Sequence, residues 1–182
     1  VTKQRVNAES PLLSASLPTG ERVQVVLPPA VATGTVAITI RRPNSRVWGL
    51  EELARGGVFE RCVGTGRAAV DPGEIDLRQC YDEGRWADFL KRAVVARKNI
   101  VVSGATGSGK TTVTKGLILK IPRSERLVVL EDAAELNLSS HANAVRLLYS
   151  KDGQGLARVS AKQLLEASLR MRPDRILLAE LR

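Results

Sequence analysis

The sequence has few aromatic residues, two cysteines and one histidine. Phe, Trp and Tyr make up 3% of the 182 residues, which disfavours a surface that binds single-stranded nucleic acid by stacking bases on aromatic rings. Cys62 and Cys80 form no CxxC pair, and there is no second pair, so a structural zinc site is not expected. We interpret both cysteines as ordinary reduced thiols, and His141 as a solvated loop residue.

Long apolar runs, a signal peptide and a basic tail are also missing from these residues. No apolar stretch approaches the roughly 20 residues of a membrane helix, and the opening residues, VTKQRVNAES, are polar. The net charge of +9 is spread along the chain. Such a charge allows contact with nucleic acid or an anionic membrane surface, although scattered solvated arginines explain it equally well. Because the chain starts at Val1, we expect it to be part of a longer protein.

Residues 12–41 have the pattern of a small antiparallel sheet. Apolar residues alternate in RVQVV and TVAITI, and Pro and Gly bound each run. We expect two or three strands here, forming the end of a small α+β N-terminal domain over residues 1–42. Residues 43–60 are expected to be a linker with one short helix before a Gly-Gly pair, and residues 61–79 to be a loop.

Helices alternate with buried strands in the rest of the chain. Apolar spacing predicts helices over residues 81–99, 110–121 and 160–171, the last with Ser160 and Gln163 as a capping box. Unbroken apolar runs predict strands over residues 99–104, 126–132, 144–150 and 174–180. This alternation is typical of an α/β fold with a parallel sheet.

The stretch GATGSGKTT at residues 104–112 contains the phosphate-loop pattern G-x-x-x-x-G-K-[ST]. Its glycines let several backbone N–H groups point at one phosphate, and the N-terminus of the following helix favours negative charge. The lysine can reach the β- and γ-phosphates, and the threonine hydroxyl after it can bind Mg²⁺. ATP with Mg²⁺ is the expected ligand. The expected nucleotide-binding residues are Gly104, Ala105, Thr106, Gly107, Ser108, Gly109, Lys110, Thr111 and Thr112.

Acidic residues follow two of the apolar runs, which places them at the carboxyl edge of the expected sheet. Glu131, Asp132 and Glu135 follow the first run, and Glu180 ends the run RILLAE. Ligands bind at this edge of open α/β sheets, so a carboxylate here could orient a water or hold Mg²⁺. An acid cluster that caps a helix is the alternative. Ala179 stands where many P-loop enzymes have Asp.

The motifs GATGSGKTT, LEDAAEL and LRMRPDRILLAELR together resemble the secretion ATPases, and most of all the VirB-type hexameric traffic ATPases of bacterial type IV secretion systems. The stretches PLLSASLPTGERVQVVLPP and TVAITIRRP resemble the end of that family's N-terminal domain. The resemblance implies a RecA-like P-loop ATPase domain over residues 61–182, incomplete after the Walker B strand. It implies that the family's subunit extends beyond both ends of this chain.

The resemblance also implies roles for individual residues. Glu131 corresponds to the catalytic carboxylate of the family, and Glu180 to the Walker B acid, which helps the loop threonine to bind Mg²⁺. The family has two arginines in its N-terminal domain that reach the phosphates. They correspond to Arg22 and Arg41, with the neighbouring Arg42 as an alternative. Arginine forks suit this task because they neutralise charge on the γ-phosphoryl oxygens.

The function that the resemblance implies is that of an ATP-hydrolysing subunit in a homohexameric motor. The motor would lie on the cytoplasmic side of the inner membrane with other secretion-system components, and power substrate translocation or pilus assembly in type IV secretion or conjugation. Contact with anionic lipid is compatible with the charge, and nucleic-acid binding is not expected as the main role. One alternative is a type II secretion or pilus ATPase, which usually carries a tetracysteine zinc module. The other is a fragment that binds nucleotide or nucleic acid without hydrolysis.

Arg170, Arg172 and Arg175 cluster near the end of an expected helix. A favourable interaction with the C-terminal end of the helix dipole is one interpretation. Contact with the nucleotide of a neighbouring subunit is the other. Trp48 and Trp86 are expected to be packing residues rather than adenine clamps.

Overall fold

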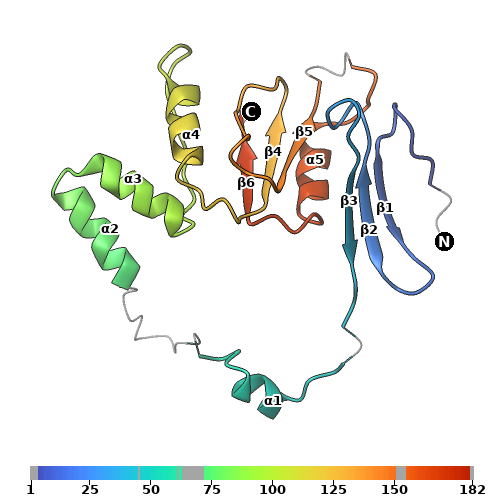
Figure 1. Ribbon diagram of the computed structural model, residues 1–182, viewed down its shortest axis with the longest axis horizontal. Helices are drawn as coiled ribbons and strands as arrows, with labels where there is room; N and C mark the ends of the chain where they lie inside the picture. Colours follow the sequence, from blue (N-terminus) through green and yellow to red (C-terminus); the bar gives the residue numbers. More distant parts are fainter. Residues whose placement is uncertain (1–3, 45, 61, 63–71, 151–154, 181–182) are drawn as a thin grey trace. The chain divides into compact units, whose positions relative to one another are not determined.

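The computed structural model describes residues 4–44, 46–60, 62, 72–150 and 155–180. Contacts between residues divide the chain into two compact units, which Figure 1 shows in ribbon form. One unit combines Val1–Pro43 with Val102–Arg182, and the other is Asn44–Val101. The first unit therefore contains the predicted strands of the N-terminal part together with the predicted phosphate loop and acidic motifs.

The N-terminal part of the first unit forms a three-stranded antiparallel sheet. Its strands are β1 (Leu12–Ser16), β2 (Arg22–Val26) and β3 (Ala37–Arg41), in the order β1-β2-β3. This confirms the antiparallel strands predicted from the alternation of apolar residues. Successive residues point to opposite faces of a sheet, so Val26 and Ala37 are buried on one face while Ile38 and Ile40 are exposed on the other.

The second sheet of this unit is parallel, as the alternation of strands and helices predicts. Its strands are β4 (Leu127–Glu131), β5 (Ala144–Leu148) and β6 (Arg175–Leu178), in the order β5-β4-β6. Helix α5 (Ala161–Ser168) connects β5 to β6 and packs against β4. Every residue of the central strand β4 is buried, which explains why its sequence, LVVLE, is almost entirely apolar.

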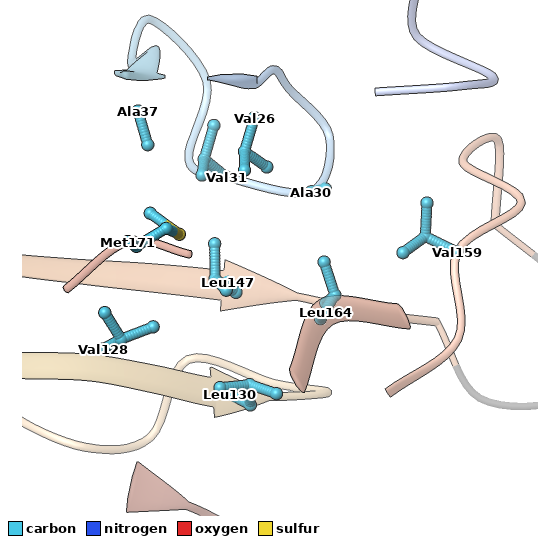
Figure 2. Close-up of a cluster of buried hydrophobic side chains, with 10 residues drawn as sticks. All are labelled: Val26, Ala30, Val31, Ala37, Val128, Leu130, Leu147, Val159, Leu164 and Met171. Atoms are coloured by element: carbon cyan, nitrogen blue, oxygen red, sulfur yellow. The ribbon is translucent and has the colours of Figure 1, made fainter. Parts of the chain in front are cut away.

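One hydrophobic cluster joins the two sheets of the first unit. Figure 2 shows side chains from β2, β3 and the turn after β2 facing those of β4, β5, α5 and the segments beside them. The Leu148 amide also donates a 2.8 Å hydrogen bond to the Ala30 carbonyl, which ties the two sheets together through the backbone. The cluster contains Val26, Ala30, Val31, Ala37, Val128, Leu130, Leu147, Val159, Leu164 and Met171.

The strand predicted over residues 99–104 is wrong, because these residues have no strand structure. Val101 is 77% exposed, although its apolar neighbours favoured a buried strand. A strand needs a neighbour that completes its backbone hydrogen bonds. The central strand β4 already has β5 on one side and β6 on the other, so within the described residues this segment finds no place beside it.

Helix α4 (Lys110–Ile118) follows the glycine-rich loop, and α5 follows Ser160. Both helices were predicted, but α4 ends at Ile118 rather than at residue 121. The capping box of α5 is confirmed. The Gln163 amide donates to Ser160 Oγ at 3.2 Å, and the Ser160 amide donates to Gln163 Oε1 at 2.9 Å.

Replacing Ser160 with Ala is expected to lower the free energy of unfolding of the full-length protein by about 1 kcal/mol, because it removes the acceptor of an otherwise unpaired helix N–H group. Chemical denaturation measures this change. Lys162→Ala, at an exposed position of the same helix, is the matched control. Equal stability of the two variants would show that the capping box contributes nothing.

The second unit consists of helices α1 (Leu50–Arg55), α2 (Pro72–Asp82) and α3 (Trp86–Val95). Helix α1 and the region of α3 were predicted. Helix α2 corrects the prediction of a loop over residues 61–79, of which 61 and 63–71 lie outside the described residues. Its proline sits in the first turn, where the missing N–H group is tolerated.

Apolar and aromatic contacts connect α2 to α3. Leu77 and Cys80, three positions apart on α2, are buried. The Tyr81 ring meets the rings of Trp86 and Phe89 edge to face, at centroid distances of 5.2 Å and 5.7 Å. Trp86 therefore packs edge to face against Tyr81, as expected, although it is 55% exposed. In the described part of the chain, no helix has both the length and the apolar character required to cross a bilayer.

Candidate functional site

The glycine-rich loop has backbone conformations that L-residues with side chains rarely adopt. Gly107 has φ of 79° and Gly109 has φ of 88°, both in the left-handed region that favours glycine. Gly109 is also the N-cap of α4. A Cβ atom added at Gly104 would lie 2.5 Å from Ser108 Oγ, so a larger residue fits there only if the Ser108 side chain moves. The sequence GATGSGKTT is therefore matched to this tight turn at three separate positions.

Lys110 is the first residue of α4 and folds back over the loop. Its Nζ donates hydrogen bonds of 2.8 Å to the carbonyl oxygens of Gly104 and Ala105. The first turn of a helix has backbone N–H groups without partners in the helix, and here they follow an exposed loop with a lysine beside it. These residues fit a triphosphate, because a concave turn, a helix N-terminus and a cation all favour bound negative charge.

Glu131 ends strand β4 and is fully buried. Its Oε1 accepts hydrogen bonds from the amides of Glu135 and Leu136, at 3.0 Å and 2.9 Å. Its Oε2 lies 2.7 Å from Arg146 Nε, as an ion pair whose atoms do not have hydrogen-bond geometry. Burial of a charge is costly unless a partner offsets it, so Arg146 and the two amides together hold this carboxylate in place.

Arg146 is a residue of this site that the sequence analysis did not identify. It lies on β5 opposite Val129 of β4, and its Nη2 also donates to the Leu136 carbonyl oxygen. Arg146 thus holds both the Glu131 carboxylate and the loop that follows it. The sequence signal for Arg146 was its charge inside the apolar run AVRLL. A charged side chain in a buried strand is costly without a partner, so its presence indicates a nearby anion.

Glu180 follows strand β6, which lies beside β4, the strand that ends at Glu131. Parallel β4 and β6 end at the same edge, and the Ala179 amide donates to the Leu130 carbonyl at 3.0 Å. The structure therefore brings the two acids predicted from separate motifs to the carboxyl edge of one sheet, where α/β folds bind ligands. Glu180 is exposed, in contrast to Glu131.

Arg22 and Arg41, far apart in the sequence, are opposite each other on β2 and β3. Both line a pocket of about 740 Å³, and Arg170 and Arg172 line it as well. Arg42, the alternative to Arg41, is not among the lining residues. The structure thus groups four arginines that the sequence analysis had placed in two unrelated sets.

Arg175, the third arginine of the cluster near α5, has a different environment. Its Nε and Nη2 donate to the two carboxylate oxygens of Glu125, at 2.6 Å and 3.3 Å. The side chains of both partners are about nine-tenths buried, with exposures of 11% and 9%. This fork geometry is the strong form of an arginine–carboxylate pair, so Arg175 has a structural partner that Arg170 and Arg172 do not share.

The interpretation of His141 as a solvated loop residue is wrong, because its side chain is only 4% exposed. Nε2 lies 3.2 Å from the Ile121 carbonyl oxygen, and Nδ1 lies 3.0 Å from Ser140 Oγ. A carbonyl oxygen only accepts, so Nε2 carries a proton in this arrangement. His141 therefore fastens its loop to the segment after α4.

Comparison with known proteins shows the family of this chain. The family described as "Type II/IV secretion system protein" matches residues 70–182, which is more than half of the chain. The chain belongs to this family. The resemblance to the secretion ATPases, which the three motifs carried, is thereby confirmed, and so are the α/β class and the RecA-like P-loop fold.

Individual members of the secretion family show how far the similarity extends. "Type IV secretion system protein VirB11" of Bartonella quintana is 47% identical over 100% of this chain and 53% of its own length. "Protein VirB11" of Rhizobium radiobacter is 50% identical over 99% of this chain and 53% of its own length. The chain thus spans about half the length of these curated relatives.

A solved structure in the same family has the same fold over the whole chain. The crystal structure of the VirB11 ATPase from the Brucella suis type IV secretion system, in complex with sulphate, matches with a TM-score of 0.89 and 44% sequence identity. The match covers 100% of this chain and 53% of that one. The chain thus spans about half of that structure as well.

Proposed function

We propose that the full-length protein is a Mg²⁺-dependent ATPase, one subunit of a homohexameric motor that powers substrate translocation or pilus assembly in bacterial type IV secretion or conjugation. The observation that carries the proposal is the phosphate loop. Its two left-handed glycines, the space at Gly104 and Lys110 at the start of α4 together favour a bound triphosphate. The similarity to type IV secretion proteins supplies the biological context.

Each part of the loop has a role toward ATP in this proposal. Bound Mg-ATP supplies the phosphoryl group whose transfer to water releases energy. The backbone amides of residues 104–112 hold the phosphate oxygens, and Lys110 exchanges its two carbonyl partners for the β- and γ-phosphates. Thr111 offers its hydroxyl to Mg²⁺, together with the carboxylate of Glu180, because Mg²⁺ prefers hard oxygen ligands.

The acid that orients the attacking water is Glu131 in this proposal. Its carboxylate is at the sheet edge but is paired with Arg146 and two amides. Because Glu131 is fully buried, the groups around its carboxylate have to move before it contacts a water molecule. The ion pair with Arg146 is the contact that can open most readily, because it lacks hydrogen-bond geometry. Arg22 and Arg41 add positive charge at the phosphates.

The domain organisation and location of the protein are part of the same proposal. Residues 1–42 belong to the N-terminal domain, residues 43–60 to the linker, and residues 61–182 to the first part of the ATPase domain. The motor lies on the cytoplasmic side of the inner membrane, with other secretion-system components as partners. The net charge of +9 supports contact with anionic lipid. The 3% of aromatic residues argues against nucleic-acid binding as the main role.

A type IV system is preferred over a type II system because of the named relatives. The family model covers both systems, but the relatives at 47% and 50% identity are VirB11 proteins. The two cysteines of this chain also lie apart, Cys62 exposed and Cys80 buried. They do not form a cysteine pair that could belong to the tetracysteine zinc module that type II ATPases usually carry.

The role of Thr111 in Mg²⁺ binding provides a test of the proposal. In the full-length protein, Thr111→Ala is expected to lower Mg²⁺-dependent phosphate release by more than about tenfold, because a hard oxygen ligand is lost. Thr111→Ser keeps the hydroxyl and is expected to retain most of the activity. A titration of Mg²⁺ at fixed ATP measures both. If alanine and serine behaved alike, Thr111 would not be a metal ligand, and an inactive wild-type protein would contradict the proposed function itself.

A further inference from the structure

One face of the antiparallel sheet changes from apolar to basic along its strands. Residues opposite each other in the register share a face. The three successive rows across this face are Leu12, Val26 and Ala37; Ser14, Gln24 and Thr39; and Ser16, Arg22 and Arg41. The first row packs in the hydrophobic cluster, and the third row presents its arginines at the pocket of about 740 Å³.

The segment after α5 supplies the other side of this pocket. Leu169, Arg170 and Arg172 line it opposite the sheet residues, and its lining contains no acidic residue. The pocket lies wholly within the first compact unit. It is therefore a built cavity with four cationic side chains from two separate parts of the chain.

The charges in this pocket are not balanced by neighbouring carboxylates. Within the described residues, none of the four arginines forms an ion pair. Like charges that share a cavity repel each other. Solvent screens these exposed side chains, but an anion bound between them would still lower the repulsion. The lining also contains Thr39, whose buried Oγ1 has no hydrogen-bond partner in the described part of the chain. An unpaired buried hydroxyl calls for an explanation, and a bound oxyanion would supply the missing partner.

The backbone at Arg172 points to the same conclusion. Arg172 has φ of 52°, a left-handed conformation that is unusual for a residue with a side chain. It also precedes Pro173, which restricts its backbone further. Such strain often occurs at functional sites, where it fixes the position of a side chain. Arg175, the third arginine of the cluster, has no such strain and is paired with Glu125. Among the arginines that line the pocket, only Arg172 has a positive φ; the other non-glycine residue with positive φ in the described part of the chain is Arg97, outside the pocket.

We propose that Arg170 and Arg172 are phosphate-binding residues, which together with Arg22 and Arg41 hold the polyphosphate tail of a nucleotide in this pocket. The inference rests on the proposed ATPase function and extends it to two residues at the end of α5. Arginine forks suit the ligand because they form paired hydrogen bonds with phosphate oxygens. The nucleotide is supplied either by the phosphate loop of the same subunit or by that of a second copy.

Nucleotide affinity in the full-length protein tests the proposal directly. The probes are a non-hydrolysable ATP analogue and ADP, titrated at constant ionic strength. Arg172→Ala is expected to raise the Kd of the ATP analogue about tenfold, and Arg170→Ala/Arg172→Ala about a hundredfold, because each charge-assisted contact is lost. Arg158→Ala, at an exposed position outside the pocket lining, is the matched control and should leave the Kd unchanged.

Arg172→Gly separates a ligand-binding role from a structural one. Glycine accepts positive φ without strain, so this variant should unfold at the same or a higher denaturant concentration than the wild type. Its Kd for the ATP analogue should nevertheless rise about tenfold. Unchanged affinity of the Arg170→Ala/Arg172→Ala variant would overturn the inference. Loss of affinity for a DNA duplex, with nucleotide affinity intact, would overturn it as well.

Lys110→Ala distinguishes a failure of the proposed ATPase function from a failure of the inference about Arg170 and Arg172. If this variant both binds and hydrolyses ATP like the wild type, the proposed function fails. If it loses binding while the arginine variants keep it, only the inference about Arg170 and Arg172 fails. Mixing full-length Lys110→Ala with Arg170→Ala/Arg172→Ala identifies the source of the nucleotide. Recovered ATPase activity in the mixture assigns the pocket to the nucleotide of a second copy, and no recovery assigns it to the same subunit.

Discussion

Lys110→Ala in the full-length protein is expected to lower ATP hydrolysis by at least about a hundredfold, since it removes the cation closest to the phosphate loop and its charge-assisted contacts. The Lys110 side chain follows a turn in which Gly107 and Gly109 have positive φ, and it already covers that turn through two hydrogen bonds to carbonyl oxygens. Those carbonyls belong to exposed residues, so the stability of the fold should change little.

Phosphate release under saturating Mg-ATP measures the effect of Lys110→Ala, and nucleotide titration shows whether binding or hydrolysis is lost. Lys115→Ala is the matched control, because Lys115 is exposed and lies on the same helix five residues later. It should retain the activity of the wild type. A Lys110→Ala variant that hydrolyses ATP at the normal rate would contradict the assignment of this loop as the nucleotide site.

Replacing Glu131 should affect both stability and hydrolysis, and two different substitutions separate these effects. Glu131→Ala removes the acceptor of two backbone amides and leaves the Arg146 charge without its partner. Loss of one partner of a buried ion pair typically costs about 3–5 kcal/mol, and we expect a decrease of this size in the free energy of unfolding. Denaturant titration of the full-length protein measures it.

Glu131→Gln has nearly the same shape and keeps an oxygen that can accept from the Glu135 and Leu136 amides. It should therefore fold with a smaller loss of stability than Glu131→Ala. If Glu131 orients the attacking water, Glu131→Gln should bind ATP normally but hydrolyse it at least about a hundredfold more slowly. Single-turnover phosphate release distinguishes these two steps.

The control for Glu131→Gln is Glu135→Gln, an exposed acid in the same loop. The Glu135 backbone amide still donates to Glu131 in this variant, so both fold and activity should be preserved. Normal hydrolysis by Glu131→Gln would show that Glu131 is only a structural anchor of the loop after β4. Full stability of Glu131→Ala would show that Arg146 and the two amides find other partners.

The sequence alone predicted the features that depend on neighbouring residues. The phosphate loop is one, because its glycines and Lys110 lie within one short segment. The capping box of Ser160 and Gln163 is another, because its two hydrogen bonds span three residues. The apolar runs of β4, β5 and β6 were also readable, since strands covered on both faces are mostly apolar, although only β4 is buried along its whole length. The family was indicated by three short motifs, each of which can be recognised within its own stretch of sequence.

Tertiary structure decided the features that depend on distant partners. Residues 99–104 look like a strand, but no described strand lies beside them to complete their backbone hydrogen bonds. His141 looks like a solvated loop residue but is buried against the Ile121 carbonyl.

The arginines and Glu131 show the same division most clearly. Sequence spacing placed Arg170, Arg172 and Arg175 in one cluster. In the fold, Arg175 pairs with Glu125. The other two line a pocket together with Arg22 and Arg41. The sequence likewise placed Glu131 at the end of a strand, but only the fold put Arg146 beside it. Local pattern determined which chemical groups this chain carries. Long-range packing decided which of them face one another, because charge and burial depend on neighbours that are remote in sequence.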